Sequence, residues 1–433
     1  MRGESTEATR INHRPALLRH LIGKVRELLK EPIFISAFNL MTNGGITAVL
    51  GFLFIIVITR LFLPSDVGIY SAIISAAGLL ALFSRFGFDI GLIRFLPSSR
   101  DPNGFVGTCQ STALVGSLAL SIVFLSGMSI WAPSLSFITD DLAFVVMFVV
   151  LTAATAVLYI QHNYYIVMRL TRQLIFRDVL RDAIKISSVV LLAPLGLSGI
   201  LGASVAALIA SFIIANMFLR RTVPGYRPRL AIKGDIARSL AKYSANNYVA
   251  GMIGSAPYLL LPILVVNIQG AEQGAYFFVA WSIATVIFIA IDAISTSFFA
   301  AGSQSVEETR RIALRSLKIA YLILAPIVAC ILLFAPNLLG MFGGEYSVNS
   351  SDLLMVLAVC TIPMAFNDLY ANTKRIKNEM RLLILYNLTM AVGILGLGTM
   401  LMSQIGIIGV GIGFLLTEVF LTIVISRKWK PWS

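Results

Sequence analysis

The chain has 433 residues, of which 58% are hydrophobic and 13% charged, with a mean hydropathy of +0.86 and a net charge of +13 at pH 7. So little polar side-chain area excludes a water-soluble globular protein, whereas a bilayer requires apolar side chains along each span of about 20 residues. The net positive charge does not indicate nucleic-acid binding, because the cations are scattered over short segments rather than gathered on one folded surface.

Residues 1–31 are predicted to form a cytoplasmic amphipathic segment ahead of the first apolar run. Within residues 16–30, one helical face is apolar and the opposite face carries Arg19, Lys24 and Arg26. This pattern is typical of an interfacial helix that anchors a chain to the inner leaflet. A charged segment of this length also differs from a cleaved signal peptide.

Twelve transmembrane helices are predicted from apolar runs that lack charged residues. Two of these runs are too long for one span, and Gly-bearing turns at 194–199 and 403–406 divide each into two helices. The predicted helices span 33–60, 66–95, 105–130, 142–165, 178–195, 198–219, 240–268, 273–301, 314–340, 350–371, 381–402 and 405–426. The predicted fold class is therefore an all-α integral membrane protein.

The distribution of cations predicts the orientation of these helices. With a cytoplasmic N-terminus, every Lys and Arg except Arg60 falls in a cytoplasmic segment or at a cytoplasmic helix end. The predicted outer turns instead carry Asp66, Asp140, Asp141, Glu272, Glu345 and Asp352. Because cytoplasmic loops are enriched in Lys and Arg, we expect a multi-pass protein of the cell membrane with both termini in the cytoplasm.

An internal repeat divides the chain into two units of six helices. Residues 66–70 (DVGIY) recur as 272–276 (EQGAY), and 199–202 (GILG) recur as 406–409 (GIIG). An even number of helices gives both units the same orientation, so the repeats are parallel, with a substrate site expected between them near the middle of the membrane. The predicted parts are an N-lobe at 32–219, a cytoplasmic linker at 220–238, a C-lobe at 239–427 and a cytoplasmic tail at 428–433.

Charged residues within the predicted spans are the candidate functional groups, because they are costly in a membrane. Arg85 and Asp89 are four residues apart, so they could form a structural ion pair, or Arg85 could face the central cavity and bind an anionic headgroup. Asp292 and Glu418 have no cation within a turn of their own helices. We assign Asp89, Asp292 and Glu418 to ion coupling or gating, with local polar contacts as the alternative.

A cationic stripe follows the cytoplasmic end of the predicted helix 178–195. Arg177, Arg181 and Lys185 are spaced by four residues. Cations that extend toward the membrane surface account for this pattern, and they are the favoured interpretation. The alternative is an entry path for a phosphorylated lipid headgroup, in which Arg181 and Lys185 bind the substrate together with Arg85.

Other classes of site have no support in the sequence. The three cysteines and three histidines lack the spacing of metal ligands or disulfides, so neither a metal nor a cofactor is expected. A Gly-Lys-Ser/Thr phosphate-binding loop is absent. The longest outer connections, near 131–141 and 341–352, are too short for a catalytic domain, which argues against a membrane enzyme.

Two stretches carry a resemblance to a known family. Residues 60–70 (RLFLPSDVGIY) and 86–95 (FGFDIGLIRF) resemble the opening of the polysaccharide flippases, the Wzx-type O-antigen and teichoic-acid exporters of the MATE-like multidrug/oligosaccharidyl-lipid/polysaccharide superfamily. The resemblance implies transport of a polyprenyl-pyrophosphate-linked oligosaccharide by alternating access, with Arg85 as the best match to the pyrophosphate site. The implied partners are that lipid-linked oligosaccharide, membrane lipids, and glycosyltransferases or a polymerase of the same pathway.

Related transporters of the same superfamily give the alternatives. Lipid II flippases carry an Arg-Asp pair in the middle of helix 1, where this chain has Phe54 and Ile55, which argues against lipid II as the substrate. The second candidate function is an ion-coupled multidrug antiporter of the MATE type. Such antiporters place a coupling carboxylate in helix 1, but residues 32–59 contain none. A major-facilitator transporter is disfavoured because residues 96–102 lack its Gly- and Arg-rich loop.

Overall fold

The computed structural model describes residues 32–227, 230–304 and 308–428, and within these ranges the chain is helical and contains no strand. The amphipathic helix predicted at 16–30 lies outside the described residues. In the first half, the helices are α3 (Pro32–Leu61), α4 (Pro64–Ser84), α5 (Phe88–Phe95), α6 (Pro102–Ser126), α7 (Met128–Trp131), α8 (Leu142–Val167), α9 (Thr171–Leu191) and α10 (Leu197–Thr222). In the second half, they are α11 (Gly234–Gln269), α12 (Ala271–Gln304), α13 (Thr309–Gly340), α14 (Gly344–Ile376), α15 (Met380–Ile405) and α16 (Ile408–Lys428).

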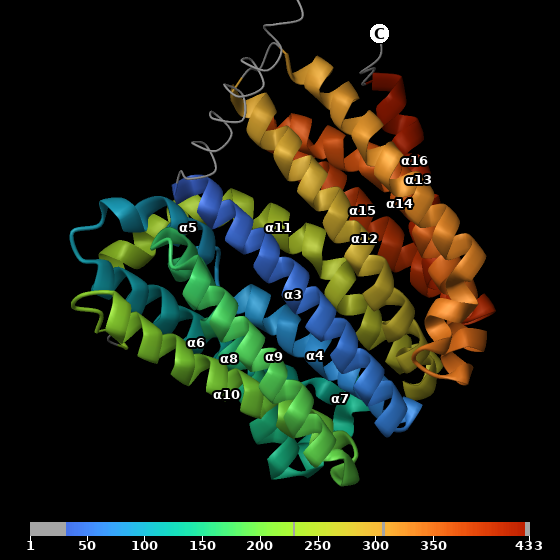
Figure 1. The fold of residues 1–433 in the computed structure, drawn as a ribbon, viewed down its shortest axis with the longest axis horizontal. Helices are drawn as coiled ribbons and strands as arrows, with labels where there is room; N and C mark the ends of the chain where they lie inside the picture. Colours follow the sequence, from blue (N-terminus) through green and yellow to red (C-terminus); the bar gives the residue numbers. More distant parts are fainter. Residues whose placement is uncertain (1–31, 228–229, 305–307, 429–433) are drawn as a thin grey trace, which may run out of the picture.

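Eleven helices of the described chain are long and apolar enough to cross a membrane, judged by length and composition. They are α3, α4, α6, α8 and α10 of the first half and α11 to α16 of the second. Helix α9 has 21 residues but carries six charged side chains between Thr171 and Leu191. It nevertheless packs along α3 and α10, inside the same bundle (Figure 1). With α9 included, the architecture is that of the predicted twelve-helix membrane protein.

The second predicted helix, 66–95, is interrupted in the structure. Phe86 and Gly87 have φ angles of 49° and 74°, so α4 ends at Ser84 and α5 begins at Phe88. Gly87 adopts this left-handed conformation at no steric cost, whereas Phe86 pays for it in strain. Hydrophobic periodicity alone does not reveal the break, because the apolar pattern runs through it.

The connection between the two halves is shorter than the predicted linker at 220–238. Helix α10 continues to Thr222, and α11 begins at Gly234. The predicted bounds followed the basic residues of this region, but charge does not end a helix. The turn at Gly225, where φ is 74°, lies inside the observed connection.

The internal repeat is visible in the way that the helices pack. In the first half, α8 packs against α4, α6 and α10, and α9 packs against α3 and α10. In the second half, the corresponding α14 packs against α12, α13 and α16, and α15 packs against α11 and α16. The two halves therefore repeat one arrangement of six spanning helices, in which α4 and α5 together correspond to α12, and the short α7 is an addition to the first half.

The halves meet along α4, which packs against α11 and α12. At this contact, the repeat-equivalent Gly68 and Gly274 lie against each other: a Cβ built on Gly274 would be 3.5 Å from the Cα of Gly68. A Cβ on Gly68 would lie 1.7 Å from the carbonyl oxygen of Ala271. The repeated DVGIY and EQGAY sequences therefore mark a close helix–helix approach that requires small residues.

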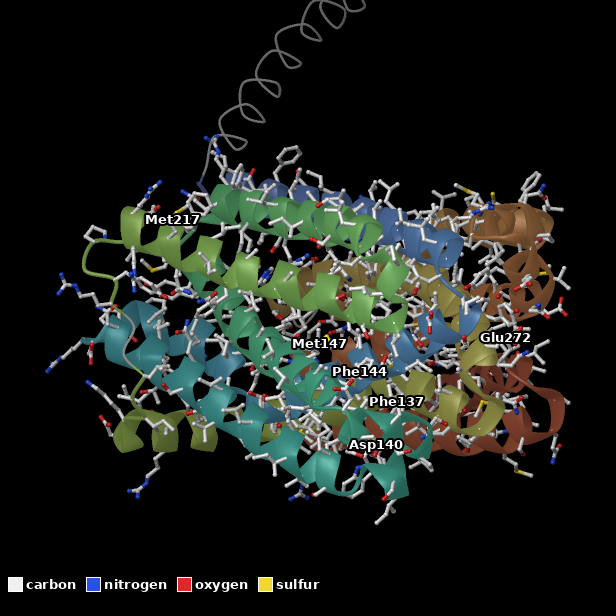
Figure 2. The ribbon with its side chains drawn as sticks, turned by 90° about the horizontal axis from the view of Figure 1, so that it is seen from below. Phe137, Asp140, Phe144, Met147, Met217 and Glu272 are labelled. Atoms are coloured by element: carbon white, nitrogen blue, oxygen red, sulfur yellow. The ribbon has the colours of Figure 1, made fainter. Side chains whose placement is uncertain are left out.

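Further contacts join the halves at the same end of the bundle. The amide N–H of Ser134 donates to Asn267 Oδ1 at 3.1 Å, and Asn267 Nδ2 donates to the carbonyl oxygen of Trp131 at 3.2 Å. Figure 2 shows Asp140 and Glu272 toward this end and Met217, near the end of α10, toward the other. Asp140 and Glu272 were both predicted in outer turns, so we refer to this end as the predicted outer end.

Candidate functional site

Three adjoining cavities form a tract that crosses from one half of the protein to the other. The first, of about 310 Å³, is lined by α4, α8, α9 and α10. The second, of about 380 Å³, shares Thr155 with the first and reaches α11. The third, of about 510 Å³, shares Ser255 and Tyr258 with the second and is lined by α11, α12, α14 and α15. The tract is polar at both ends, which distinguishes it from the apolar surface that faces lipid.

The first cavity contains two cations of the predicted stripe. Arg181 lines it and is neutralised, because its Nε donates to Asp182 Oδ1 at 2.8 Å and its Nη1 lies 3.3 Å from Asp178 Oδ1. Arg177, the third member of the stripe, is buried and lies 2.6 Å from Asp178. Asn43 Nδ2 also donates to Asp178 at 2.9 Å, which ties α9 to α3. Charge pairing therefore explains how a helix as polar as α9 packs inside the bundle.

Lys185 differs from its neighbours on α9. Its Nζ lies 3.7 Å from the ring centroid of Phe54 and 5.7 Å from that of Tyr70, in the wall of the first cavity. No carboxylate forms an ion pair with it in the part of the chain that the structure describes. Aromatic faces stabilise an ammonium group without neutralising it. Lys185 therefore presents its ammonium group to the cavity without a carboxylate partner among the described residues.

Arg85 and Asp89 form the ion pair that their spacing predicted and also lie at the second cavity. Arg85 Nη1 is 3.0 Å from Asp89 Oδ2, and its Nε donates to the carbonyl oxygen of Ala81 at 3.2 Å. The guanidinium carbon lies 3.6 Å from the ring centroid of Tyr159. Arg85 is only 7% exposed, yet it lines the cavity together with Tyr159 and Tyr258. Both interpretations of Arg85, as structural partner and as cavity cation, are compatible with this geometry.

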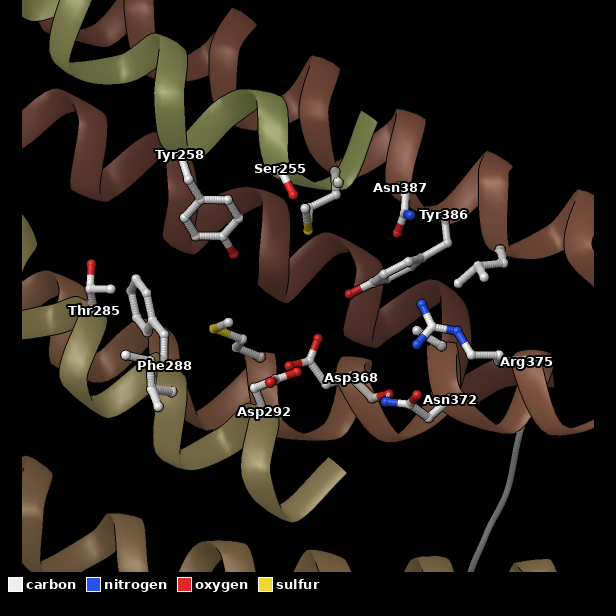
Figure 3. Close-up of a pocket in the computed structure, with 16 residues that line it drawn as sticks. Ser255, Tyr258, Thr285, Phe288, Asp292, Asp368, Asn372, Arg375, Tyr386 and Asn387 are labelled. Atoms are coloured by element: carbon white, nitrogen blue, oxygen red, sulfur yellow. Dashed lines mark hydrogen bonds between the residues drawn. The ribbon is translucent and has the colours of Figure 1, made fainter. Parts of the chain in front are cut away.

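The third cavity gathers polar groups of both charges from the second half. Figure 3 shows Asp292 of α12 and Asp368 of α14 on one side, with Arg375 and the Tyr386 hydroxyl directed toward the same space. Asn372 and Asn387 complete its polar lining. No ion pair involving Asp292, Asp368 or Arg375 occurs among the described residues. These groups therefore remain available to a ligand.

Sequence reasoning identified only Asp292 in this cavity. Asp368 met the same criterion, a carboxylate inside a predicted span, but it lies three residues from the predicted end of helix 350–371. Arg375 was assigned to the cytoplasmic cations by the charge distribution. Tyr386 and Asn387 carried no signal, because a single polar residue on an apolar helix is most often a packing residue. Their convergence is a property of the tertiary fold.

Glu418 lies behind the third cavity and does not line it. It is fully buried on α16, and its Oε2 accepts a hydrogen bond of 2.7 Å from Asn367 Nδ2. Its other oxygen, Oε1, has no hydrogen-bond partner within the described residues. Asn367 precedes Asp368 in the chain and also accepts a hydrogen bond from Thr422. Glu418 is therefore connected to the cavity wall through a short polar network.

The described residues contain no cluster of three or more His, Cys, Asp or Glu side chains that could hold a metal ion. The cysteines are unpaired thiols, with Cys109 and Cys360 buried and Cys330 exposed.

The chain was compared with known protein families and solved structures. A family model described as "Polysaccharide biosynthesis protein" matches residues 57–352. No curated protein matches the chain. Among solved structures, the lipid II flippase MurJ in an inward closed conformation is similar over 91% of this chain and 87% of its own, with a TM-score of 0.71 and 10% identity.

Multidrug transporters are similar as well. A MATE family transporter in an inward-facing conformation gives a TM-score of 0.64 at 17% identity, over 87% of this chain and 92% of its own. One in an outward-facing conformation gives 0.59 at 16% identity, over 92% and 95%. At these identities the likeness establishes the fold, which is that of the MATE-like transporters.

Proposed function

The chain belongs to the family of polysaccharide biosynthesis proteins, and on this premise we propose that it is a flippase for a polyprenyl-pyrophosphate-linked oligosaccharide. It moves this lipid from the cytoplasmic to the outer leaflet of the cell membrane, with both of its own termini in the cytoplasm. The glycosyltransferases that make the oligosaccharide, or the polymerase that uses it, are its partners in the pathway. The protein performs transport and no covalent chemistry.

The observation that carries this proposal is the unneutralised Lys185 beside an intramembrane cavity. A cation inside the membrane is costly and is normally paired or functional. Its aromatic neighbours hold it in place, and a pyrophosphate would supply the missing negative charge through charge-assisted hydrogen bonds. Arg181 and Arg85 add guanidinium donors toward the second cavity. Pairing with Asp182 and Asp89 makes them weaker anion sites than Lys185.

The mechanism that we propose is rocking of two lobes, 32–219 and 239–427, about the contact between α4 and α12. In the described state, Arg60, Ser134 and Asn267 join the halves at the predicted outer end. A state closed at that end would accept substrate from the cytoplasmic side. Opening of the outer contacts would then release the lipid to the other leaflet.

Coupling to an ion gradient is assigned to Asp89, Asp292 and Glu418. Asp292 is exposed in the cavity, and one oxygen of Glu418 has no hydrogen-bond partner among the residues that the structure describes. A carboxylate inside a membrane protein is a candidate relay for a proton or a metal cation, whether it lacks a cation partner, as Asp292 and Glu418 do among the described residues, or exchanges one, as Asp89 could exchange Arg85. These same groups support the second candidate function, an ion-coupled multidrug antiporter of the MATE type.

Translocation in proteoliposomes distinguishes the two functions. The purified protein is reconstituted with a fluorescent polyprenyl-pyrophosphate oligosaccharide, and the lipid reaching the opposite leaflet is measured by quenching from outside. Protein-dependent movement between leaflets is the expected result. Ion-driven efflux of a cationic dye, with no lipid movement for several lipid-linked glycans, would instead establish the antiporter.

A further inference from the structure

The third cavity has features of a carbohydrate site that the cationic first cavity lacks. Building on the flippase proposed above, we propose that the third cavity binds the sugar units next to the pyrophosphate, while Lys185 and Arg85 hold the pyrophosphate itself. The transported lipid would then be recognised in two parts by the two halves of the protein. The argument rests on one unpaired hydroxyl, on the mixture of polar groups around it, and on the aromatic wall.

Tyr386 is the strongest indication of a ligand. Its side chain is 7% exposed, and its hydroxyl has no hydrogen-bond partner within the described chain. Figure 3 shows this hydroxyl directed into the cavity, on the side facing Asp368. A buried hydroxyl without a partner is costly. A sugar hydroxyl in the cavity would satisfy it, because both groups donate and accept hydrogen bonds.

The surrounding groups offer several hydrogen-bond acceptors together with the donors of one guanidinium. Asn387 Nδ2 donates to the carbonyl oxygen of Ala250 at 2.9 Å, and Asn372 Nδ2 donates to that of Asp368 at 3.2 Å, which orients both amides and leaves their side-chain oxygens as acceptors. Asp292 and Asp368 add carboxylate acceptors, and the guanidinium of Arg375 adds donors. Neighbouring hydroxyls on a sugar ring require such a mixture.

An aromatic wall completes the cavity. Tyr258 lines it and is held by Trp281 and Phe288, at centroid distances of 5.7 Å and 6.3 Å. The C–H face of a sugar ring packs well against such a surface. Tyr258 also belongs to the second cavity, so a sugar against it would adjoin a pyrophosphate near Arg85.

Other ligands fit the third cavity less well. A bare cation could use the two carboxylates but would leave the Arg375 guanidinium in the same cavity without an acceptor. An apolar drug would leave the polar groups without partners. The volume of about 510 Å³ lies within the range of roughly 300–1,000 Å³ that is typical of small-molecule sites.

The test compares two lipids on the same protein. One is the lipid-linked oligosaccharide pool extracted from cells that make the protein's own polysaccharide. The other is polyprenyl pyrophosphate of the same chain length without sugar. Affinities are measured for the full-length protein in nanodiscs, and their ratio reports the sugar contribution independently of any inactive fraction.

The variants are Tyr386→Phe and Asp368→Asn, with Tyr346→Phe as the matched control. The hydroxyl of Tyr346 is also buried and has no hydrogen-bond partner in the described part of the chain, but Tyr346 does not line the cavity. The wild type should bind the glycan-bearing lipid at least about tenfold more tightly. Tyr386→Phe should reduce this preference roughly three- to tenfold, as expected for one hydrogen bond, while binding of the sugar-free lipid and the behaviour of Tyr346→Phe stay unchanged.

Three results would overturn the proposal. Equal binding of the two lipids by the wild type would exclude a glycan site in this cavity but would not contradict the proposed flippase function. An undiminished preference in both variants would exclude the third cavity from glycan binding, and loss of ion-stimulated transport in the same variants would make it a cation site. Binding of neither lipid would contradict both the proposed flippase function and this inference.

Discussion

Arg60 Nη2 donates a hydrogen bond of 2.9 Å to the carbonyl oxygen of Gly340, the last residue of α13. Its Nε donates to the carbonyl oxygen of Met341 at 3.0 Å. The last carbonyl groups of a helix have no partner inside the helix and form the negative end of its dipole. Arg60, the one cation predicted outside the cytoplasmic segments, therefore joins α3 to the second half at the predicted outer end.

Arg60→Gln is expected to favour opening of the outer end. Removing this exposed contact should destabilise the closed state relative to the open state by about 1 kcal/mol, which is roughly a fivefold change in the ratio of closed to open states. Distances between spin labels on the outer ends of α3 and α13 measure this ratio. An unchanged distance distribution would show that the other contacts at this end are sufficient.

Arg85→Ala is expected to abolish glycan export without affecting insertion or abundance. The substitution removes the cavity cation and leaves Asp89 without its partner. Arg85→Ala combined with Asp89→Asn separates the two effects, because it restores neutrality without restoring the cation. Recovery of export in the double variant, or normal export by Arg85→Ala, would support the purely structural interpretation of the pair.

Lys185→Gln is expected to weaken binding of sugar-free polyprenyl pyrophosphate by roughly ten- to a hundredfold, the range for one charge-assisted hydrogen bond. Lys318→Gln, on α13 and outside the three cavities, is the control. The measurement is an equilibrium titration in nanodiscs. Equal affinities for the two variants would exclude Lys185 from the headgroup site.

Glu418→Gln is expected to remove the response of transport to a pH gradient while leaving substrate binding intact. The amide preserves the shape of the side chain and can still accept the hydrogen bond from Asn367, but it cannot exchange a proton. Transport rates with and without an imposed pH gradient provide the test. A gradient response equal to that of the wild type would assign coupling to Asp89, Asp292 or another group.

Gly68→Ala is expected to lower the thermal stability and to disturb the contact between the halves. Its new methyl group would overlap the carbonyl oxygen of Ala271 on α12. Gly45→Ala is the control, because nothing lies within 4 Å of a Cβ at that position. Unfolding temperatures in detergent compare the two variants. Equal unfolding temperatures would mean that α4 and α12 can move apart to accommodate the new methyl group at little cost in free energy.

The fold could be predicted because membrane spans leave strong signals in a sequence. Long uncharged runs located the helices, and the repeated motifs around Gly68 and Gly274 indicated two equivalent units. The break after Ser84 was missed because it depends on the backbone conformation of Phe86 and Gly87. Local hydrophobicity contains no information about that conformation.

The candidate site was predicted in part: most of its charged residues in the first half of the chain were identified, but few of its residues in the second half were. Arg85, Arg181 and Lys185 were identified because cations within spans are rare, and all three line cavities. The same sequence pattern did not distinguish the paired Arg181 from Lys185, which has no ion pair among the described residues, since pairing depends on rotamers and on the neighbouring helices. The uncharged Tyr386 gave no signal at all.

The contact between Gly68 and Gly274 is of the kind found in symmetric homodimers, in which one surface patch meets its own copy across a twofold axis. A single six-helix unit could have formed it with a second copy of itself, so the contact is compatible with an ancestral dimer that became one gene by duplication. After fusion, the two copies would no longer have needed the same sequence. Arg85 and Asp292, which occupy positions within one residue of equivalence, now carry opposite charges. A homodimer must place the same residue at both positions, whereas a fused chain can evolve each separately.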